Sequence, residues 1–246
     1  MTDLAIIGGT GLATLKNLEV TWRQVVHTPF GEPSCPLTYG HLCGKEVVFL
    51  PRHGSGHTIP PHKINYRANL WALKKTGATR VIAVAAVGSI STELVVSELA
   101  LPDQIIDYTW GRGHTFFEED LRGVVHVDFT YPYCSKLRSL LLKAAAAAGL
   151  SMADWVTYGA TQGPRLETAA EIDRLERDGC HVVGMTGMPE AALARELELS
   201  YAAIAVIANQ AAGRSENLIE MASVEQNLNR GMEKVRRLLE QLIPLA

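Results

Sequence analysis

Five short apolar runs without alternation recur along this chain, and they constrain its fold more than any other feature of the sequence. Glycine or polar residues bound each run, and stretches with helical periodicity lie between them. The runs are LAII (4–7), EVVFL (46–50), RVIAVAAV (80–87), HVVGM (181–185) and YAAIAVIA (201–208). Unbroken apolar segments of this length are typical of strands covered on both faces. The sequence therefore predicts an α/β fold.

Signals for helices lie between and after these runs. Thr168 and Glu171 stand at the T-x-x-E spacing of a capping box, which predicts that a helix begins after Thr168. An apolar stripe over residues 224–242 predicts a core-facing helix, and Ser223 is its expected cap. The chain shows no shift in composition and no Pro/Gly/Ser linker, so residues 1–246 are predicted to form a single domain.

Composition and charge limit the possible partners. The 246 residues are 47% apolar and carry a net charge of −3 at pH 7, which argues against a nucleic-acid groove or an anionic membrane surface as the main partner. We expect a cytoplasmic protein, because neither a secretory leader nor a membrane-length apolar run is recognisable. The four cysteines lack C-x-x-C spacing, which favours reduced structural thiols over disulfides or a zinc site.

A glycine-rich turn follows the first apolar run, in IIGGTGL (6–12). Glycines let the backbone fold closely around an anion, and the hydroxyl of Thr10 would add one donor. A dinucleotide-binding fold would instead need a third glycine after the turn and an acidic residue ending the next strand. LATL (12–15) and Glu19 stand at these places, so a nucleotide-binding oxidoreductase is the less favoured alternative.

A basic loop follows the second run, in PRHGSGH (51–57). The planar fork of Arg52 fits two phosphate oxygens, and His53 can donate one more bond. His53 and His57 make an unconvincing metal pair, because two intervening glycines disfavour the helix that would align them. The loop is therefore interpreted as an anion-binding loop, with a solvated basic loop as the alternative.

Two further strand ends offer donors to an anion. VAAVGSI (84–90) presents the backbone N–H groups of Ala85 and Ala86, and GMTGMPEAA (184–192) presents the Thr186 hydroxyl where a helix begins. Together with the two loops above, these strand ends predict a phosphate pocket.

Several motifs together resemble the trimeric purine nucleoside phosphorylases, and within them the 5′-methylthioadenosine phosphorylase branch. The resemblance rests on GGTG, TPFGEPS (28–34), RHG followed by HT, NYRANLWALK (65–74), QGPRLET (162–168) and GMTGMPEAALARE (184–196). It implies a mixed sheet with barrel character flanked by helices, and a homotrimer with active sites near the subunit contacts. It also implies that inorganic phosphate is a co-substrate and that neither a cofactor nor a metal is required.

The resemblance also implies roles for individual residues. Asn209, Arg52 and His53 are the expected catalytic residues. The expected phosphate contacts are Thr10, Arg52, His53, Ala85, Ala86 and Thr186. The expected nucleoside contacts are Met185 at the ribose, Leu166, Asn209, Gln210 and Ala211 at the base, and Val224 and His126 at the 5′ group, with His126 reaching across from a neighbouring subunit.

Asn209 bears on the choice of base. Enzymes of the resembling branch that cleave 6-aminopurine thionucleosides have aspartates at the positions of Asn209 and Ala211. An amide offers an N–H donor to a 6-oxo group and a carbonyl oxygen to N7–H, whereas two amino donors would repel each other there.

We therefore expect phosphorolysis of S-methyl-5′-thioinosine to hypoxanthine and 5-methylthioribose 1-phosphate. Cleavage of 5′-methylthioadenosine, or of inosine and guanosine, is the alternative within the resembling family. A non-catalytic nucleoside-binding protein is a further alternative, but it would have no need for Arg52, His53 and Thr186 to converge.

Overall fold

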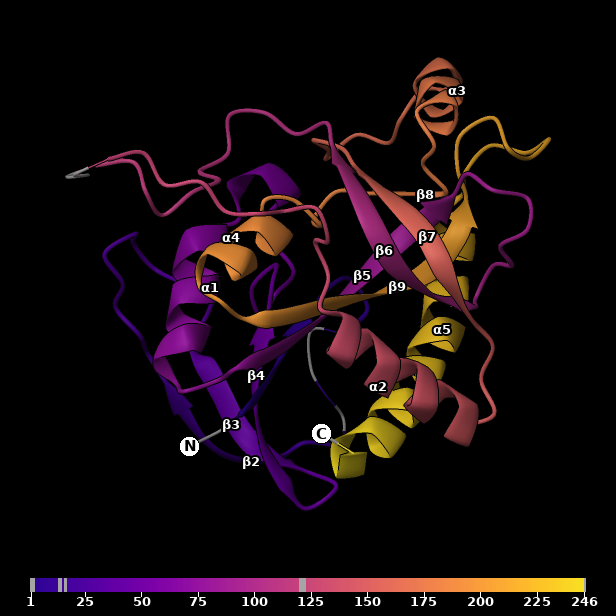
Figure 1. Cartoon of the computed structure of the whole chain (residues 1–246). Coiled ribbons are helices and arrows are strands. Elements are labelled where there is room, and N and C mark those ends of the chain that lie inside the picture. Colours follow the sequence, from indigo (N-terminus) through magenta and orange to yellow (C-terminus); the bar gives the residue numbers. More distant parts are fainter. Residues whose placement is uncertain (1–2, 13–14, 16, 120–122, 246) are drawn as a thin grey trace.

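Strands from most of the length of the chain form one mixed sheet. The computed structural model describes residues 3–12, 15, 17–119 and 123–245. Within them, the strands have the order β2-β3-β4-β1-β5-β8-β7-β6-β9 (Figure 1). The strands are β1 (Leu4–Gly8), β2 (Glu19–Gln24), β3 (Leu37–Leu42), β4 (Lys45–Pro51), β5 (Arg80–Ser89), β6 (Leu99–Asp107), β7 (Met152–Ala160), β8 (Val182–Gly184) and β9 (Ser200–Gln210).

Part of this sheet closes on itself. Strand β9 pairs parallel with β5 from Arg80↔Ser200 onward, and antiparallel with β6 at Leu99↔Val206. The strands β5, β8, β7, β6 and β9 therefore form a closed ring, while β1 to β4 extend the sheet outward. This arrangement confirms the predicted mixed sheet with barrel character.

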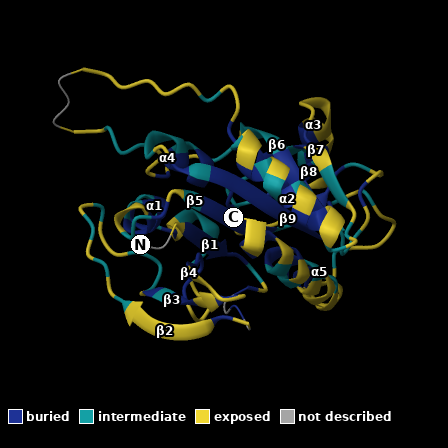
Figure 2. Ribbon diagram, turned by 60° about the horizontal axis from the view of Figure 1, so that its bottom comes forward, coloured by how far each residue is buried: buried dark blue, intermediate teal, exposed yellow. Residues whose placement is uncertain are grey.

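Helices cover the sheet and define two main cores. The helices are α1 (Tyr66–Lys75), α2 (Ser135–Ala147), α3 (Ala169–Arg177), α4 (Glu190–Glu196) and α5 (Met221–Leu242). Buried residues of α1 and α4 pack into one core cluster, whereas those of α2 and α5 pack into the other. Figure 2 shows the strands β5 and β9 buried between these helices. None of the helices in the described residues is both long enough and apolar enough to cross a bilayer.

The apolar runs and the capping box were read correctly. Four of the five runs fall within a strand, and HVVGM (181–185) extends one residue beyond β8 at each end. Thr168 forms the predicted box and accepts from the Glu171 amide before α3. The start of α5 differs from the prediction, because this helix begins at Met221 after Glu220 and has no side-chain cap at Ser223. Other strands were not predicted: β2 is almost entirely exposed, so it lacks the apolar run that marks a covered strand.

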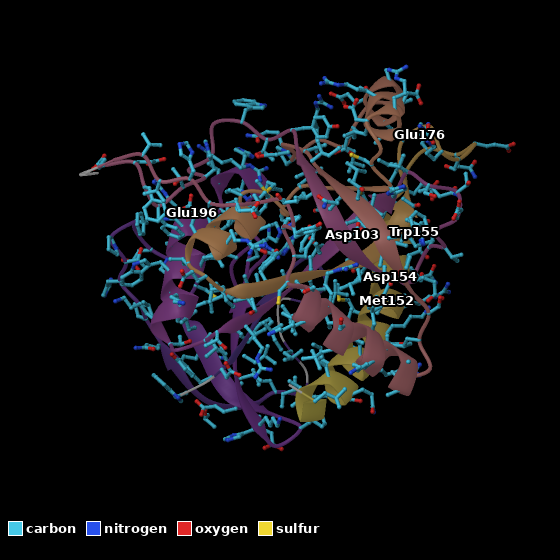
Figure 3. The ribbon with its side chains drawn as sticks, viewed as in Figure 1. Asp103, Met152, Asp154, Trp155, Glu176 and Glu196 are labelled. Carbon is cyan, nitrogen blue, oxygen red and sulfur yellow. The ribbon has the colours of Figure 1, made fainter. Side chains whose placement is uncertain are left out.

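A long segment between β6 and α2 leaves the body of the molecule. We call residues 113–119 and 123–131 the arm; it extends to one side in Figure 1 and is largely exposed. Glu196, labelled at the end of α4 in Figure 3, holds the start of the arm. Its carboxylate accepts from the Thr115 hydroxyl and from the Phe116 amide, both at 2.7 Å.

Candidate functional site

A cavity of about 280 Å³ lies at the carboxyl ends of the parallel strands β1, β4, β5 and β9. This edge is where ligands of open α/β sheets bind. Hollows of about 450 and 1120 Å³ lie beside α3 and beneath the arm, but no predicted site residue that the structure describes lines them. The smaller cavity brings together Thr10, Arg52, His53, Ala85, Ala86, Leu166, Met185, Thr186, Asn209, Ala211 and Val224.

The Arg52 guanidinium is buried beside this cavity and has three protein acceptors. Its Nε and Nη2 donate to the two carboxylate oxygens of Glu190 at 2.6 and 2.8 Å, and Nη1 donates to the Val84 carbonyl at 2.9 Å. The Tyr201 hydroxyl donates to the same Glu190 carboxylate at 2.8 Å. Burial opposes the charged guanidinium, but the attraction of Glu190 outweighs it and raises the pKa of Arg52. The guanidinium of Arg52, which was expected to bind phosphate with two N–H groups, thus binds Glu190 in this way. One N–H on each of its Nη nitrogens is left for a ligand.

Gly9 makes room for this arrangement. A Cβ at this position would lie 2.9 Å from Nη1 of Arg52 and would collide with the carbonyl oxygen of Val84. The glycine turn therefore lets three chain segments meet at the cavity.

His53 presents a hydrogen-bond acceptor to the cavity. Its Nδ1 lies 2.8 Å from the carbonyl oxygen of Ile59. Because a carbonyl oxygen only accepts, Nδ1 carries the proton, and Nε2 of the neutral ring keeps its lone pair. Burial and the neighbouring Arg52 lower the pKa of His53 to about 4, so the ring is neutral at pH 7. The sequence suggested that His53 donates a bond, whereas its remaining nitrogen fits a P–OH donor.

His57 also lines the cavity, although the sequence analysis did not place it among the binding residues. Its Nε2 lies 3.5 Å from the Thr10 hydroxyl oxygen, and its ring centroid lies 4.5 Å from that of His53. Its backbone has a positive φ of 52°, in the left-handed region. Burial lowers the pKa of this imidazole. The four-residue spacing of His53 and His57, which did not support a metal site, could have indicated that both histidines lie at the same cavity.

Asn209 lies near the end of β9, opposite Gly88 of β5. A Cβ at Gly88 would lie 3.4 Å from Nδ2 of Asn209, so the glycine leaves space for the amide. Nδ2 donates to the carbonyl oxygen of Gln210 at 2.7 Å. One N–H and the carbonyl oxygen of the Asn209 side chain therefore stay available to a ligand.

The two residues after Asn209 lie differently. Ala211 is buried and lines the cavity, whereas Gln210 is exposed and does not. Successive residues of an extended chain point to opposite sides, which places Gln210 away from its neighbours. The structure thus does not bring the predicted Gln210 into the site.

Glu167 is a further cavity residue that the sequence analysis missed. Its Oε1 accepts a hydrogen bond from the Thr161 hydroxyl at 2.6 Å, which holds the carboxylate in place. It follows Leu166 in the QGPRLET motif, where the sequence analysis used only the leucine. The cavity therefore contains an acceptor-only group in addition to the amide of Asn209.

Apolar side chains form one wall of the cavity, and His126 lies outside it. Ile219, Met221 and Val224 line the cavity at and before the first turn of α5. His126 is exposed on the arm, which points away from the body (Figures 1 and 2). Within one chain, the structure does not bring His126 into the cavity.

Comparisons with known proteins agree with this geometry. The family model described as the phosphorylase superfamily matches residues 3–244. A probable S-methyl-5′-thioinosine phosphorylase from Pseudomonas syringae pv. tomato is 53% identical over 243 residues, 99% of each chain. The 6-oxopurine nucleoside phosphorylase of Pyrococcus furiosus is 44% identical over 250 residues, covering 100% of this chain and 93% of its own. The solved methylthioadenosine phosphorylase of Schistosoma mansoni in complex with adenine has a TM-score of 0.95 at 33% identity, covering 100% of this chain and 92% of its own.

Proposed function

This chain belongs to the phosphorylase superfamily, and on that premise we propose that it cleaves S-methyl-5′-thioinosine with phosphate. The products are hypoxanthine and 5-methylthioribose 1-phosphate. The observation that carries the proposal is one cavity that combines phosphate donors with the side chains of Asn209 and Glu167.

Phosphate binding rests on the strand ends. The free N–H groups of Arg52, the hydroxyls of Thr10 and Thr186, and the one backbone N–H of the Ala85–Ala86 segment that points away from β9 are donors suited to an oxyanion.

The base is read by complementary donors and acceptors. Hypoxanthine carries a carbonyl at C6 and a hydrogen on N1, whereas adenine has an amino group at C6 and a lone pair on N1. The Glu167 carboxylate accepts from N1–H of hypoxanthine but would face the lone pair of adenine. Asn209 donates its free N–H to O6 and accepts from N7–H through its carbonyl oxygen. Both side chains therefore favour the 6-oxopurine.

The 5′ group is bound by the apolar wall and by a neighbouring copy. Met221 and Val224 offer apolar surface to a methylthio group. We infer a homotrimer in which the arm of one subunit brings His126 to the next subunit's cavity. The cytoplasmic location and the absence of a nucleic-acid partner remain predictions from the sequence.

The reaction proceeds by loss of the purine and capture of the sugar. The C1′–N9 bond breaks with its electron pair going to the purine, and a phosphate oxygen bonds to the cationic C1′. In the balanced reaction, the proton of hydrogen phosphate ends on hypoxanthine. Nε2 of His53 accepts the P–OH hydrogen bond while phosphate is bound, and Asn209 stabilises the negative charge that develops on the purine.

A phosphate-dependent assay with three nucleosides tests the proposal. S-methyl-5′-thioinosine, 5′-methylthioadenosine and inosine are compared at equal concentration, and we expect kcat/KM for thioinosine to exceed that for methylthioadenosine at least about 100-fold. A preference for methylthioadenosine would refute the base assignment. Equal rates for inosine and thioinosine would instead favour the function that the Pyrococcus furiosus relative's name states, 6-oxopurine nucleoside phosphorolysis.

Variants of Asn209 test the same point. We expect Asn209→Ala to lower kcat/KM for thioinosine about 100- to 1000-fold, because a preorganised donor to the developing charge is lost. Gln210→Ala is the matched control, since the adjacent side chain is exposed and outside the cavity. A wild-type value for Asn209→Ala would contradict the assignment.

A further inference from the structure

Arg112 is a buried arginine outside the cavity that contacts two of the loops forming it. It lies between β6 and the arm and is only 8% exposed. Its Nη1 donates to the carbonyl oxygens of Met185 and Met188 at 2.9 and 2.6 Å. Its Nη2 donates to the carbonyl oxygens of Thr161 and Gln162 at 3.3 and 2.9 Å. One guanidinium therefore joins two loops that are separate in the sequence.

Both loops carry cavity residues. The first loop, residues 161–168, contributes Leu166 and Glu167, and the second, residues 185–188, contributes Met185 and Thr186. The loops also touch at Gly163, where an added Cβ would collide with Sδ of Met185. A shift of either loop would move side chains proposed to bind phosphate, ribose and base.

The donors of Arg112 are fully used by the protein. Its Nε lies 3.2 Å from the side-chain oxygen of Gln162, and Nη1 lies 3.2 Å from the Tyr66 hydroxyl. Among the described residues, no carboxylate pairs with this guanidinium, so its charge is balanced by carbonyl dipoles. With every N–H committed, Arg112 has no donor left for a ligand.

We propose that Arg112 is a positioning residue that sets the two loops in the geometry required for substrate binding. It acts through the carbonyl groups of Met185 and Gln162, so it orders both halves of the site without touching substrate. Its five directional donors suit this task, which a single ammonium group could not perform equally. The kinetic part of this proposal rests on the proposed phosphorolysis, whereas the structural part does not.

Arg112→Met is the main test, and Arg165→Met is its control. Arg165 lies in the same loop, but its side chain is 68% exposed and pairs with Glu171. We expect Arg112→Met to raise KM for phosphate and for nucleoside about 10- to 100-fold each, because displacements near 1 Å have effects of this size. Arg165→Met is expected to change both KM values less than about two-fold. Unchanged KM values in Arg112→Met would overturn the proposal.

Amide hydrogen exchange gives a readout that does not depend on activity. We expect exchange to accelerate in residues 161–168 and 185–188 of Arg112→Met, while β2 and β3 keep wild-type rates. Uniform acceleration across the chain would overturn a local role and indicate general destabilisation. If Arg112→Met does not fold, Arg112→Lys keeps the charge with fewer donors, and the same local pattern is expected there. Failure of wild-type phosphorolysis would overturn the proposed function alone, because the exchange pattern would still test the loops.

Discussion

The buried pair of Arg52 and Glu190 should show strong energetic coupling. Their side chains are 1% and 0% exposed and are joined by two hydrogen bonds of 2.6 and 2.8 Å. Removing one partner leaves the other charged and buried, so we expect Arg52→Met and Glu190→Leu each to lower the free energy of unfolding by about 3–5 kcal/mol. The double variant buries no charge, and the groups that lose a partner in it are the Tyr201 hydroxyl, which costs about 1–3 kcal/mol, and the Val84 carbonyl.

Urea unfolding without phosphate measures this double-mutant cycle. The double variant should be more stable than either single variant, which gives a coupling energy of several kcal/mol. Protein concentration is kept constant, because an oligomer's apparent stability depends on it. The exposed pair Arg174 and Asp178, at 3.7 Å, is the control and should couple by less than about 1 kcal/mol. Additive losses in the Arg52 and Glu190 cycle would refute the argument.

Three further predictions concern single residues. The pKa of His53 is about 4 in the folded protein and 6.5 in the unfolded chain. Therefore about 3 kcal/mol of the free energy of unfolding that is present above pH 6.5 should be lost as the pH falls to 4. A His53→Gln variant whose free energy of unfolding in urea shows the same pH dependence would contradict this. Gly9→Ala should lower the free energy of unfolding by about 1–3 kcal/mol by collision with Val84, whereas Gly123→Ala, with nothing within 4 Å, should be neutral in thermal unfolding. Thr168→Ala should cost about 1 kcal/mol in urea unfolding through loss of the α3 cap, and loss of phosphorolysis would show a wider role.

Local signals carried the parts of the fold that could be predicted. The capping box at Thr168 involves residues three apart, and five strands (β1, β4, β5, β8 and β9) each coincide with an apolar run. Strand β6 could not be predicted from an apolar run, because Pro102 and polar residues interrupt its sequence. Its pairing with β7 also contains register shifts. The predicted start of α5 was wrong because serine is a preferred cap residue, whereas the helix begins at Met221, two residues before Ser223.

The site shows the same division. The strand-end positions of Thr10, Arg52 and Asn209 follow from the order of strands and turns, so sequence patterns could indicate them. The partner of Arg52 could not be inferred in this way, because Glu190 reaches it only through tertiary packing and resembles an ordinary first-turn carboxylate. Gln210 was misjudged because it borders two cavity residues in sequence but points to the opposite side of the strand.

Closure of the barrel by β9 has a consequence for how the enzyme is made. Thr10 and Arg52 leave the ribosome early, but the ring cannot close until Ser200 and its successors pair with β5. Bringing together strands so distant in sequence costs chain entropy before any contact compensates for it. A nascent chain that ends before β9 is complete therefore holds most of the proposed phosphate donors without a closed cavity around them. We therefore expect phosphate and nucleoside to bind only when synthesis is almost complete.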